Sequence, residues 1–219
     1  MSVPLSAPPS APSPSVARTE SAQRVLDTAL ELFSQHGYDG TSLQLIADRL
    51  GVTKAAVYYH FHTKEEILAA LVQPAFAELE QLVTDSASSS SATARRDRGL
   101  AGYIDYLLRH RSLSRFLSQD ISALSRPMVW EPAQALDHRI ESLLTGEADS
   151  DLARVWGSAM MRGLIAALLS NPDASEPWLR AELAEIGRHM IAGYRKAQRR
   201  EAAGEPRVAA AGQSASARR

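Results

Sequence analysis

The spacing of apolar residues is helical over almost the whole chain, and this feature constrains the fold most. Ala22, Leu26, Ala29 and Phe33 recur at steps of three and four residues, which places them on one face of a helix. No stretch of the sequence alternates apolar and polar residues for long enough to predict a strand. With 219 residues, of which 45% are hydrophobic, the chain can bury a substantial core. The sequence therefore predicts an all-α fold.

Capping signals delimit the first two helices. Thr19 is the predicted N-cap of the first helix, because its hydroxyl can accept from a free helical N–H. Gly37 is the predicted end of that helix. Thr41 and Gln44 have the spacing of a capping box, which predicts a second helix that begins there and ends at Gly51.

The same signals predict seven further helices. Thr53 offers an N-cap for a short helix that reaches about His60. Thr63 and Glu66 have the pattern of a second capping box, which opens a long helix through about Val83. Proline, glycine and Asn-Pro signals separate five more helical stretches, at approximately 96–110, 113–124, 131–145, 151–169 and 176–198. The total is about nine helices.

Low-complexity stretches lie at both ends and near the middle of the chain. Residues 1–17 contain five prolines and five serines, which predicts a disordered arm. The serine-rich stretch that starts at Ser86 is predicted to form a loop. Residues 199–219 are predicted to form a disordered tail.

Charge and cysteine content limit the function classes. The formal net charge is −1, so binding of nucleic acid would need a local surface rather than bulk positive charge. The absence of cysteine excludes disulfides and thiolate metal sites and fits a reducing cytoplasm. The N-terminus does not have the pattern of a secretory signal, and no later segment is expected to reach the length of a membrane span.

Two short helices joined by the residues GVT have the pattern of a helix-turn-helix over about residues 42–61, whose second helix enters the major groove of DNA. At 100° per residue, Val57 and Phe61 face the protein. The residues that face the other way are Ala55, Tyr58, Tyr59 and His62.

The stretch TSLQLIADRLGVTKAAVYYHFHTKEEILAALV resembles the DNA-binding domain of the TetR family of bacterial transcriptional repressors. The motifs that carry the resemblance are LFSQHGYDGTS, IADRLGV, YYHF and KEEIL, and the resemblance covers about residues 18–72. The resemblance implies a DNA-binding domain over residues 18–64 and a helical ligand-binding and dimerisation domain over residues 65–198. It also implies a homodimer that binds operator DNA and a small-molecule inducer in the bacterial cytoplasm, associated with the nucleoid through its operator. No catalytic residue, cofactor or metal is implied.

The resemblance also assigns residues to the DNA contact. Thr41 and Ser42 match backbone contacts at the start of the second helix, and Lys64 matches a phosphate contact at the start of the fourth. Residues 18–64 hold five Lys/Arg and five Asp/Glu, so specific binding should need two copies acting together. The positions that match the DNA-facing side of the recognition helix are Lys54, Ala55, Ala56, Tyr58, Tyr59 and His60.

Aromatic and sulfur-containing side chains are the candidate lining of a ligand pocket for a largely apolar molecule. Arg162 sits in an apolar helix that should be buried on both sides, and it would either anchor a ligand or pair with a carboxylate across the dimer. His110 and Gln119 are further candidate polar anchors. Pro74 predicts a kink near residues 70–73, which would help this helix move when a ligand binds. The candidate lining residues are Phe76, Tyr103, Tyr106, Phe116, Trp130, Trp156 and Met160.

The last two predicted helices are the candidate dimer interface. Gly157 and Gly163 would allow close approach of helices, and apolar residues of the last helix step by four, three and four as in a coiled coil. These residues could also pack within one chain. The apolar residues are Leu179, Leu183, Ile186 and Met190.

Other interpretations compete with the DNA-binding one. The run VYYHF could be core packing, and His60 with His62 could bind a metal, but two residues is the wrong spacing for a helical metal pair. The sequence has no Gly-rich phosphate loop and no G-x-S-x-G, which argues against an enzyme. A helical interaction module would leave the helix-turn-helix unexplained. A transcriptional activator and a regulator without a ligand remain open.

Overall fold

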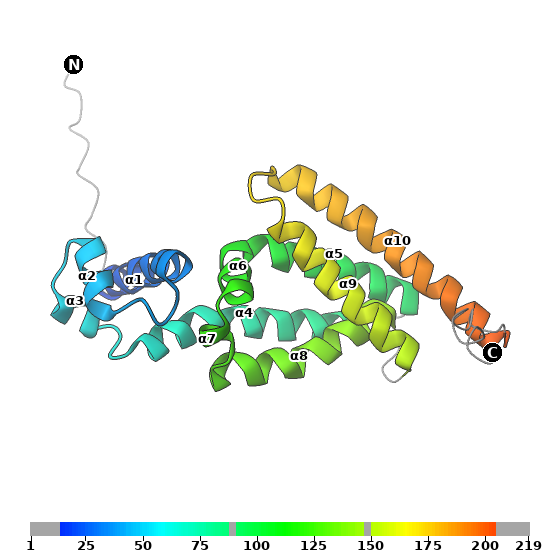
Figure 1. Cartoon of the computed structure of the whole chain (residues 1–219), viewed down its shortest axis with the longest axis horizontal. Helices are drawn as coiled ribbons and strands as arrows, with labels where there is room; N and C mark the ends of the chain where they lie inside the picture. The colour runs from blue at the N-terminus through cyan, green and yellow to red at the C-terminus, as the bar shows by residue number, and fades with distance from the viewer. Residues whose placement is uncertain (1–13, 88–90, 147–149, 205–219) are drawn as a thin grey trace, which may run out of the picture. The chain divides into compact units, whose positions relative to one another are not determined.

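The computed structural model describes residues 14–87, 91–146 and 150–204. These residues form ten helices and no strand, which confirms the all-α prediction (Figure 1). The helices are α1 Pro14–His36, α2 Leu43–Leu50, α3 Lys54–Tyr58, α4 Lys64–Ala87, α5 Ala92–Arg109, α6 Arg111–Gln119, α7 Ile121–Leu124, α8 Pro127–Thr145, α9 Asp151–Leu169 and α10 Glu176–Ala202.

Several helix ends differ from the predicted ones. α1 begins at Pro14, so Thr19 lies inside the helix and is not its N-cap. The predicted loop after Ser86 is mostly helical, because α4 extends to Ala87 and α5 starts at Ala92. The predicted helix 113–124 is divided at Asp120, whose carboxylate caps α7, and this division accounts for ten helices instead of nine. Residues 1–13 of the predicted arm and 205–219 of the predicted tail lie outside the described residues.

The described helices pack into two units. Unit 1 consists of the residues up to Pro74 together with Arg115–Val129, and unit 2 consists of Ala75–Ser114 and the residues from Trp130 onward. The division differs from the predicted boundary at residue 64, because the first eleven residues of α4 and the segment 115–129 belong to the unit that contains the helix-turn-helix. We refer to this segment as the α6–α7 segment. α4 runs on through Pro74, and a kink there stays a prediction.

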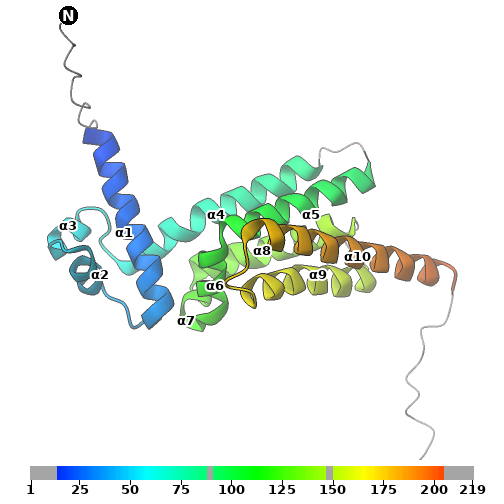
Figure 2. The same ribbon diagram turned by 90° about the horizontal axis from the view of Figure 1, so that it is seen from above.

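Unit 1 is built on α1, with α2 and α3 beside it (Figure 2). Leu32 and Phe33 of α1 are buried against the apolar face of α2, where Ile46 and Ala47 are fully buried. The start of α4 is held locally, since Thr63 Oγ1 accepts from the Glu66 N–H at 3.1 Å. The core of the unit includes Val25, Ala29, Leu32, Phe33, Tyr38, Ile46, Ala47, Val57, Ile67, Leu68 and Phe116.

Unit 2 is built around α5, which packs against both arms of the α9–α10 hairpin. Small residues permit the close contacts. A Cβ on Gly187 of α10 would lie 2.5 Å from Leu100 of α5, and a Cβ on Gly99 of α5 would lie 2.5 Å from Leu143 of α8. Both distances are shorter than ordinary contacts of a Cβ, so a side chain at either position would force the facing leucine to move.

Two tyrosines of α5 should make the stability of the protein fall at high pH. Burial, with a smaller contribution from Glu78, raises the pKa of Tyr106 to about 12, and burial also raises the pKa of Tyr103. The neutral phenols contribute their full stability below pH 10.0, the ordinary phenol pKa. That contribution is lost between pH 10 and 12, at about 1.4 kcal/mol per pH unit for each tyrosine. Urea unfolding from pH 8 to 11 measures the slope, and Tyr106→Phe should reduce it; an unchanged slope in this variant would contradict the assignment.

Two helices are long and apolar enough, by length and composition, to cross a membrane. The sequence had led us to expect no segment of that length after the N-terminus. The two helices are Lys64–Ser86 and Asp151–Leu169, and 28% and 33% of their respective apolar segments are buried. Length and composition do not separate such a span from a helix of a bundle, and α9 packs through its buried face on α5 and α10.

Candidate DNA interface

Gly51 forms the turn between α2 and α3. Its φ of 68° lies in the left-handed region, which a residue with a Cβ adopts only at a cost. The Val52 N–H then donates to the carbonyl of Ala47 at 3.0 Å, which satisfies the end of α2. α3 begins at once, because Thr53 Oγ1 accepts from the Ala56 N–H at 3.2 Å. The result is a helix-turn-helix with the predicted cap at Thr53 and the predicted glycine at its turn.

We expect Gly51→Ala to destabilise the protein by about 1 kcal/mol. A Cβ at this position would meet no atom within 4 Å, so the cost arises from backbone conformation alone. Urea unfolding measures the difference. Gly204 is a matched control, because it has the same φ of 68° and the same open surroundings but follows the end of α10, where fraying can relieve the strain. An equal loss at both positions would argue against this account.

α3 has one buried and one exposed face. Val57 is fully buried, whereas Tyr58 and Tyr59 are 50% and 61% exposed. This division matches the predicted faces, except that Phe61 is only half-buried. The exposed residues include a lysine, two phenols and two small side chains, a set that can reach both phosphates and base edges in a major groove. They are Lys54, Ala55, Ala56, Tyr58 and Tyr59.

The two histidines of this region lie in different surroundings. His60 is half-buried, and its Nε2 lies 3.0 Å from Ser21 Oγ of α1. His62 is exposed, with its ring edge against Tyr58 at 4.6 Å between centroids. His60 therefore joins α3 to α1, and its assignment as a DNA contact stays a prediction.

The start of α2 is capped by Ser42 rather than by Thr41. Ser42 Oγ accepts from the Leu45 N–H at 3.2 Å. Thr41 is 2% exposed, and its hydroxyl donates to the Gly37 carbonyl at 2.9 Å. The predicted capping box is wrong, since Gln44 bonds to Asp48 instead. Of the two predicted contacts, the exposed Ser42 can offer its side chain to DNA and Thr41 cannot.

Lys64 is engaged inside the protein. Its Nζ donates to the Tyr38 carbonyl at 2.8 Å and lies 3.4 Å from the carbonyls of Asp39 and Thr41. It also lies over the Tyr38 ring, 4.5 Å from the centroid. These contacts make Lys64 a structural link between the start of α4 and the turn after α1. A phosphate contact by the same ammonium stays a prediction and would compete with them.

The predicted pocket residues do not form one group. Phe76, Tyr106 and Trp156 pack against the buried cluster of unit 2 that contains Tyr103 and Met160. Phe116 lies instead in unit 1, where its ring stacks on Phe33 at 5.4 Å between centroids. Trp130 is 47% exposed. The structure thus brings together five of the seven candidates.

The candidate polar anchors already have partners or lie at the surface. His110 Nε2 lies 2.9 Å from Glu78 Oε2, and its ring neighbours Tyr106 at 4.8 Å between centroids. Gln119 is exposed. Arg162, which was expected to be buried, is 70% exposed and has its Nη2 3.9 Å from Asp137 Oδ2 of α8 in the same chain. Desolvation raises the pKa of Asp137, and Arg162 opposes that shift.

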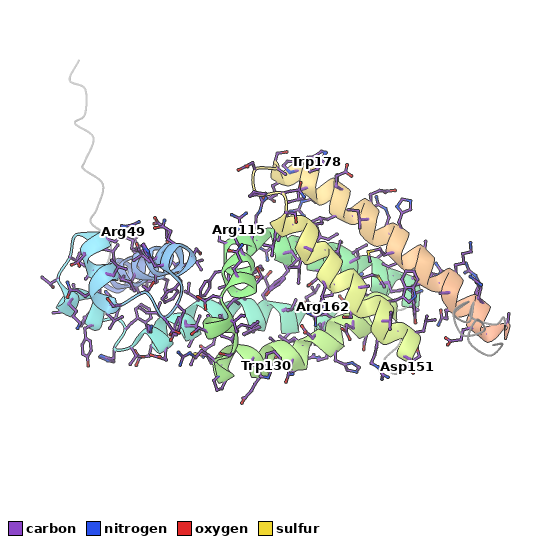
Figure 3. The ribbon with its side chains drawn as sticks, viewed as in Figure 1. Arg49, Arg115, Trp130, Asp151, Arg162 and Trp178 are labelled. Carbon is purple, nitrogen blue, oxygen red and sulfur yellow. The ribbon has the colours of Figure 1, made fainter. Side chains whose placement is uncertain are left out.

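The candidate dimer residues divide between the interior and the surface. Leu179 and Leu183 are buried in the core of the single chain, and Gly157 faces Glu141 of α8. Ile186 is 40% exposed, whereas Met190 is half-buried, with its Cε 3.8 Å from a Cβ built on Gly163. α9 is not buried on both sides in one chain, as Val155 is 69% exposed. Figure 3 labels Arg162 midway along α9 and Trp178, 51% exposed, near the start of α10.

Neither Asp120 nor Tyr38 belongs to a motif that marks it as a functional residue. Asp120 Oδ2 accepts from the Tyr38 N–H at 2.6 Å although 82 residues separate the two. The only signal in the sequence is that aspartate is a favourable N-cap for the helix that follows it. That signal predicts a helix start and reveals nothing about a second, distant partner.

Comparison with known proteins places the helix-turn-helix in a family. Residues 25–71 match the sequence model of bacterial regulatory proteins, tetR family. Residues 25–71 therefore have the sequence of a TetR-type DNA-binding domain. One TetR-family relative is the negative transcriptional regulator IcaR of the biofilm operon icaADBC from Staphylococcus aureus (strain Newman), 37% identical over 68 residues. That match covers 31% of this chain and 37% of the relative's length, so it concerns about a third of each protein.

Solved structures extend the TetR likeness to the whole fold. A member of the TetR family from Streptomyces coelicolor A3 has a TM-score of 0.64 and 22% identity, over 77% of this chain and 90% of that one. The regulator FadR from Bacillus subtilis, crystallised with stearoyl-CoA, has a TM-score of 0.52 and 18% identity, over 75% of this chain and 96% of that one. At these identities the likeness shows the fold alone.

Proposed function

We propose that the protein is a homodimeric transcriptional repressor that leaves its operator when a small, largely apolar molecule binds unit 2. The proposal that the protein binds DNA rests on the two faces of α3. Val57 is buried in the core on one face, whereas Lys54, Tyr58 and Tyr59 are exposed on the other. Lysine and tyrosine side chains on such a helix can hold phosphates while small neighbours let it approach the bases.

Two copies should be required for tight binding. Positive and negative side chains balance over residues 18–64, so one copy gains little from bulk electrostatics. A symmetric dimer presents two recognition helices, which read half-sites about one DNA turn apart. The similarity of part of the chain to the negative regulator IcaR supports repression over activation.

The proposed dimer surface is the exposed side of the α9–α10 hairpin, which we call the hairpin face. It consists of Val155, Trp178 and Ile186, three of the large apolar residues that are exposed among the described residues. Exposed apolar residues on adjacent helices mark interaction surfaces. Leu179 and Leu183 would support this face from beneath, since both already pack in the core of one chain.

Ligand binding would act on the aromatic cluster of unit 2. Phe76, Tyr103, Tyr106, Trp156 and Met160 pack together or against one core, and FadR, which has the same fold, was crystallised with an acyl-CoA. Because α4 continues from unit 1 into unit 2, a ligand that moves α4 would change the separation of the two recognition helices. Such a protein needs no catalytic residue, cofactor or metal and would work in the bacterial cytoplasm, at the nucleoid.

Selection from random DNA tests the proposed function. We expect enrichment of a sequence with two inverted half-sites, and an affinity that falls steeply between 50 and 200 mM salt, as roughly 6–10 phosphate contacts require. Mass spectrometry of the natively purified protein should identify a small molecule whose addition releases that DNA. Failure of any sequence to be enriched would refute the DNA-binding proposal, and release by no bound molecule would refute the ligand response.

A further inference from the structure

The turn between α1 and α2 is held by a residue from a distant part of the chain. Gly37 ends α1 with a φ of 76°, and its N–H still donates to the Phe33 carbonyl at 2.9 Å. The next N–H, that of Tyr38, has left the helix and donates to Asp120 Oδ2 at 2.6 Å. Tyr38 is fully buried, so without Asp120 this N–H would lose its partner in a place that water reaches poorly.

Asp120 uses both of its carboxylate oxygens. While Oδ2 binds the turn, Oδ1 accepts from the Ala123 N–H at 2.8 Å and caps α7. Hydrogen bonds from N–H groups to a carboxylate are short and strong. One side chain thus joins the start of α7 to the turn after α1, within unit 1.

Neighbouring contacts hold the α6–α7 segment in the same place. Phe116 is 1% exposed, and its ring stacks on Phe33 of α1 with an interplanar angle of 22°. The carboxylate of Asp39 accepts from the Ser122 hydroxyl and lies 3.3 Å from Arg126 Nη2. The hydrogen bond from Ser122, helped by the charges of Lys64 and Arg126, lowers the pKa of Asp39.

The turn that Asp120 holds leads directly into the helix-turn-helix. Thr41 bonds back to the Gly37 carbonyl at 2.9 Å, and Ser42 caps α2. The position of the Tyr38 backbone therefore sets where α2 begins. α2 in turn packs on α3, the helix proposed to enter the groove.

We infer that Asp120 is a positioning residue for operator recognition: it touches no DNA but fixes the α1–α2 turn from which the helix-turn-helix starts. The inference rests on the proposed function. It assigns to DNA recognition a residue that lies outside the region matched by the family, which ends at residue 71. A misplacement of the recognition helix weakens all its contacts together, since each depends on register in the groove.

Asp120→Ser separates the two roles of the carboxylate. Serine is a good N-cap and can still cap α7, but its single hydroxyl cannot also accept from the Tyr38 N–H. We expect operator affinity to fall about 10-fold, the equivalent of one unsatisfied buried N–H, and exchange of the Tyr38 amide hydrogen to become faster.

The charge change acts in the direction opposite to the expected loss of affinity. Asp120→Ser removes a negative charge, which on electrostatic grounds alone should strengthen binding to DNA. A weaker complex can therefore arise only from altered geometry. Ser118→Ala is the matched control, since it removes only an exposed hydrogen bond to the Arg115 carbonyl within α6 and should change affinity by less than about 2-fold.

Each outcome decides between the alternatives. Equal or tighter operator binding by Asp120→Ser would overturn the inference. Fast exchange of the Tyr38 amide in the folded wild-type protein would also overturn it. If Asp120→Ser does not fold, Asp120→Asn, which caps α7 at nearly the same volume, takes its place with the same criteria. A wild-type protein that selects no operator refutes the proposed function itself.

Discussion

Replacing Lys54 and Tyr58 together by alanine is expected to weaken operator binding by at least about 100-fold, because each contact of this kind is worth roughly 1–3 kcal/mol. Both side chains are exposed on α3, and alanine favours helix, so the stability of the protein should change by less than about 0.5 kcal/mol. Fluorescence anisotropy with labelled operator at fixed salt measures the affinity. Loss of Lys54 should also reduce the slope of log affinity against log salt by about one.

Matched variants separate loss of contacts from loss of fold. Trp130→Ala removes an aromatic side chain that is 47% exposed on α8, and it should leave operator affinity unchanged. Tyr58→Phe keeps the ring and removes only the hydroxyl, so an affinity between those of wild type and Tyr58→Ala would identify a phosphate bond from the phenol. Unchanged binding by the Lys54/Tyr58 double variant would exclude α3 as the reading helix.

Lys64 is unsuitable for the same test. Its ammonium bonds to the Tyr38 carbonyl at 2.8 Å and lies near two others. Lys64→Ala would remove the ammonium that joins these three carbonyls, and among the described residues only the Thr41 N–H would still donate to the Tyr38 carbonyl. Reduced DNA binding could therefore reflect a displaced turn as well as a lost phosphate contact. The contribution of Lys64 to binding can be read only beside a measurement of stability.

The second large effect is expected at the hairpin face. Replacing Val155 and Ile186 by aspartate should convert the dimer into monomers, because two carboxylates on each chain would have to be buried without partners. Operator affinity should then fall by more than about 100-fold, since one copy engages only one half-site. Light scattering reports the mass, and the helix content should remain that of the wild type.

Ile121→Asp is the control for this pair of substitutions. Ile121 is 80% exposed but lies on α7, outside the hairpin face, so a carboxylate there should leave the mass unchanged. A double variant at Val155 and Ile186 that stays dimeric would place the interface elsewhere. One that becomes monomeric yet binds its operator normally would refute the need for two copies.

The local parts of the site could be predicted from sequence because their causes are local. The N-cap at Thr53 acts on an N–H three residues away, and the left-handed glycines at positions 37 and 51 end helices through bonds within one turn. Helical spacing correctly placed Val57 inside and Tyr58 outside. The prediction of Thr41 as the N-cap of α2 was wrong. Thr41 and Ser42 both have side chains suited to the role, and only the burial of Thr41 in the tertiary structure distinguishes them.

The all-α fold, the helix-turn-helix and the exposed face of its second helix could therefore be predicted from residue patterns, since periodicity and capping act over a few residues. Which side chains remain available for function depends instead on the tertiary structure. It engaged Lys64 with the turn after α1, turned Leu179 and Leu183 into the core, and brought Asp120 to the Tyr38 N–H across 82 residues. A side chain's partner depends on which distant backbone group the packing leaves unpaired, and no spacing along the chain encodes that.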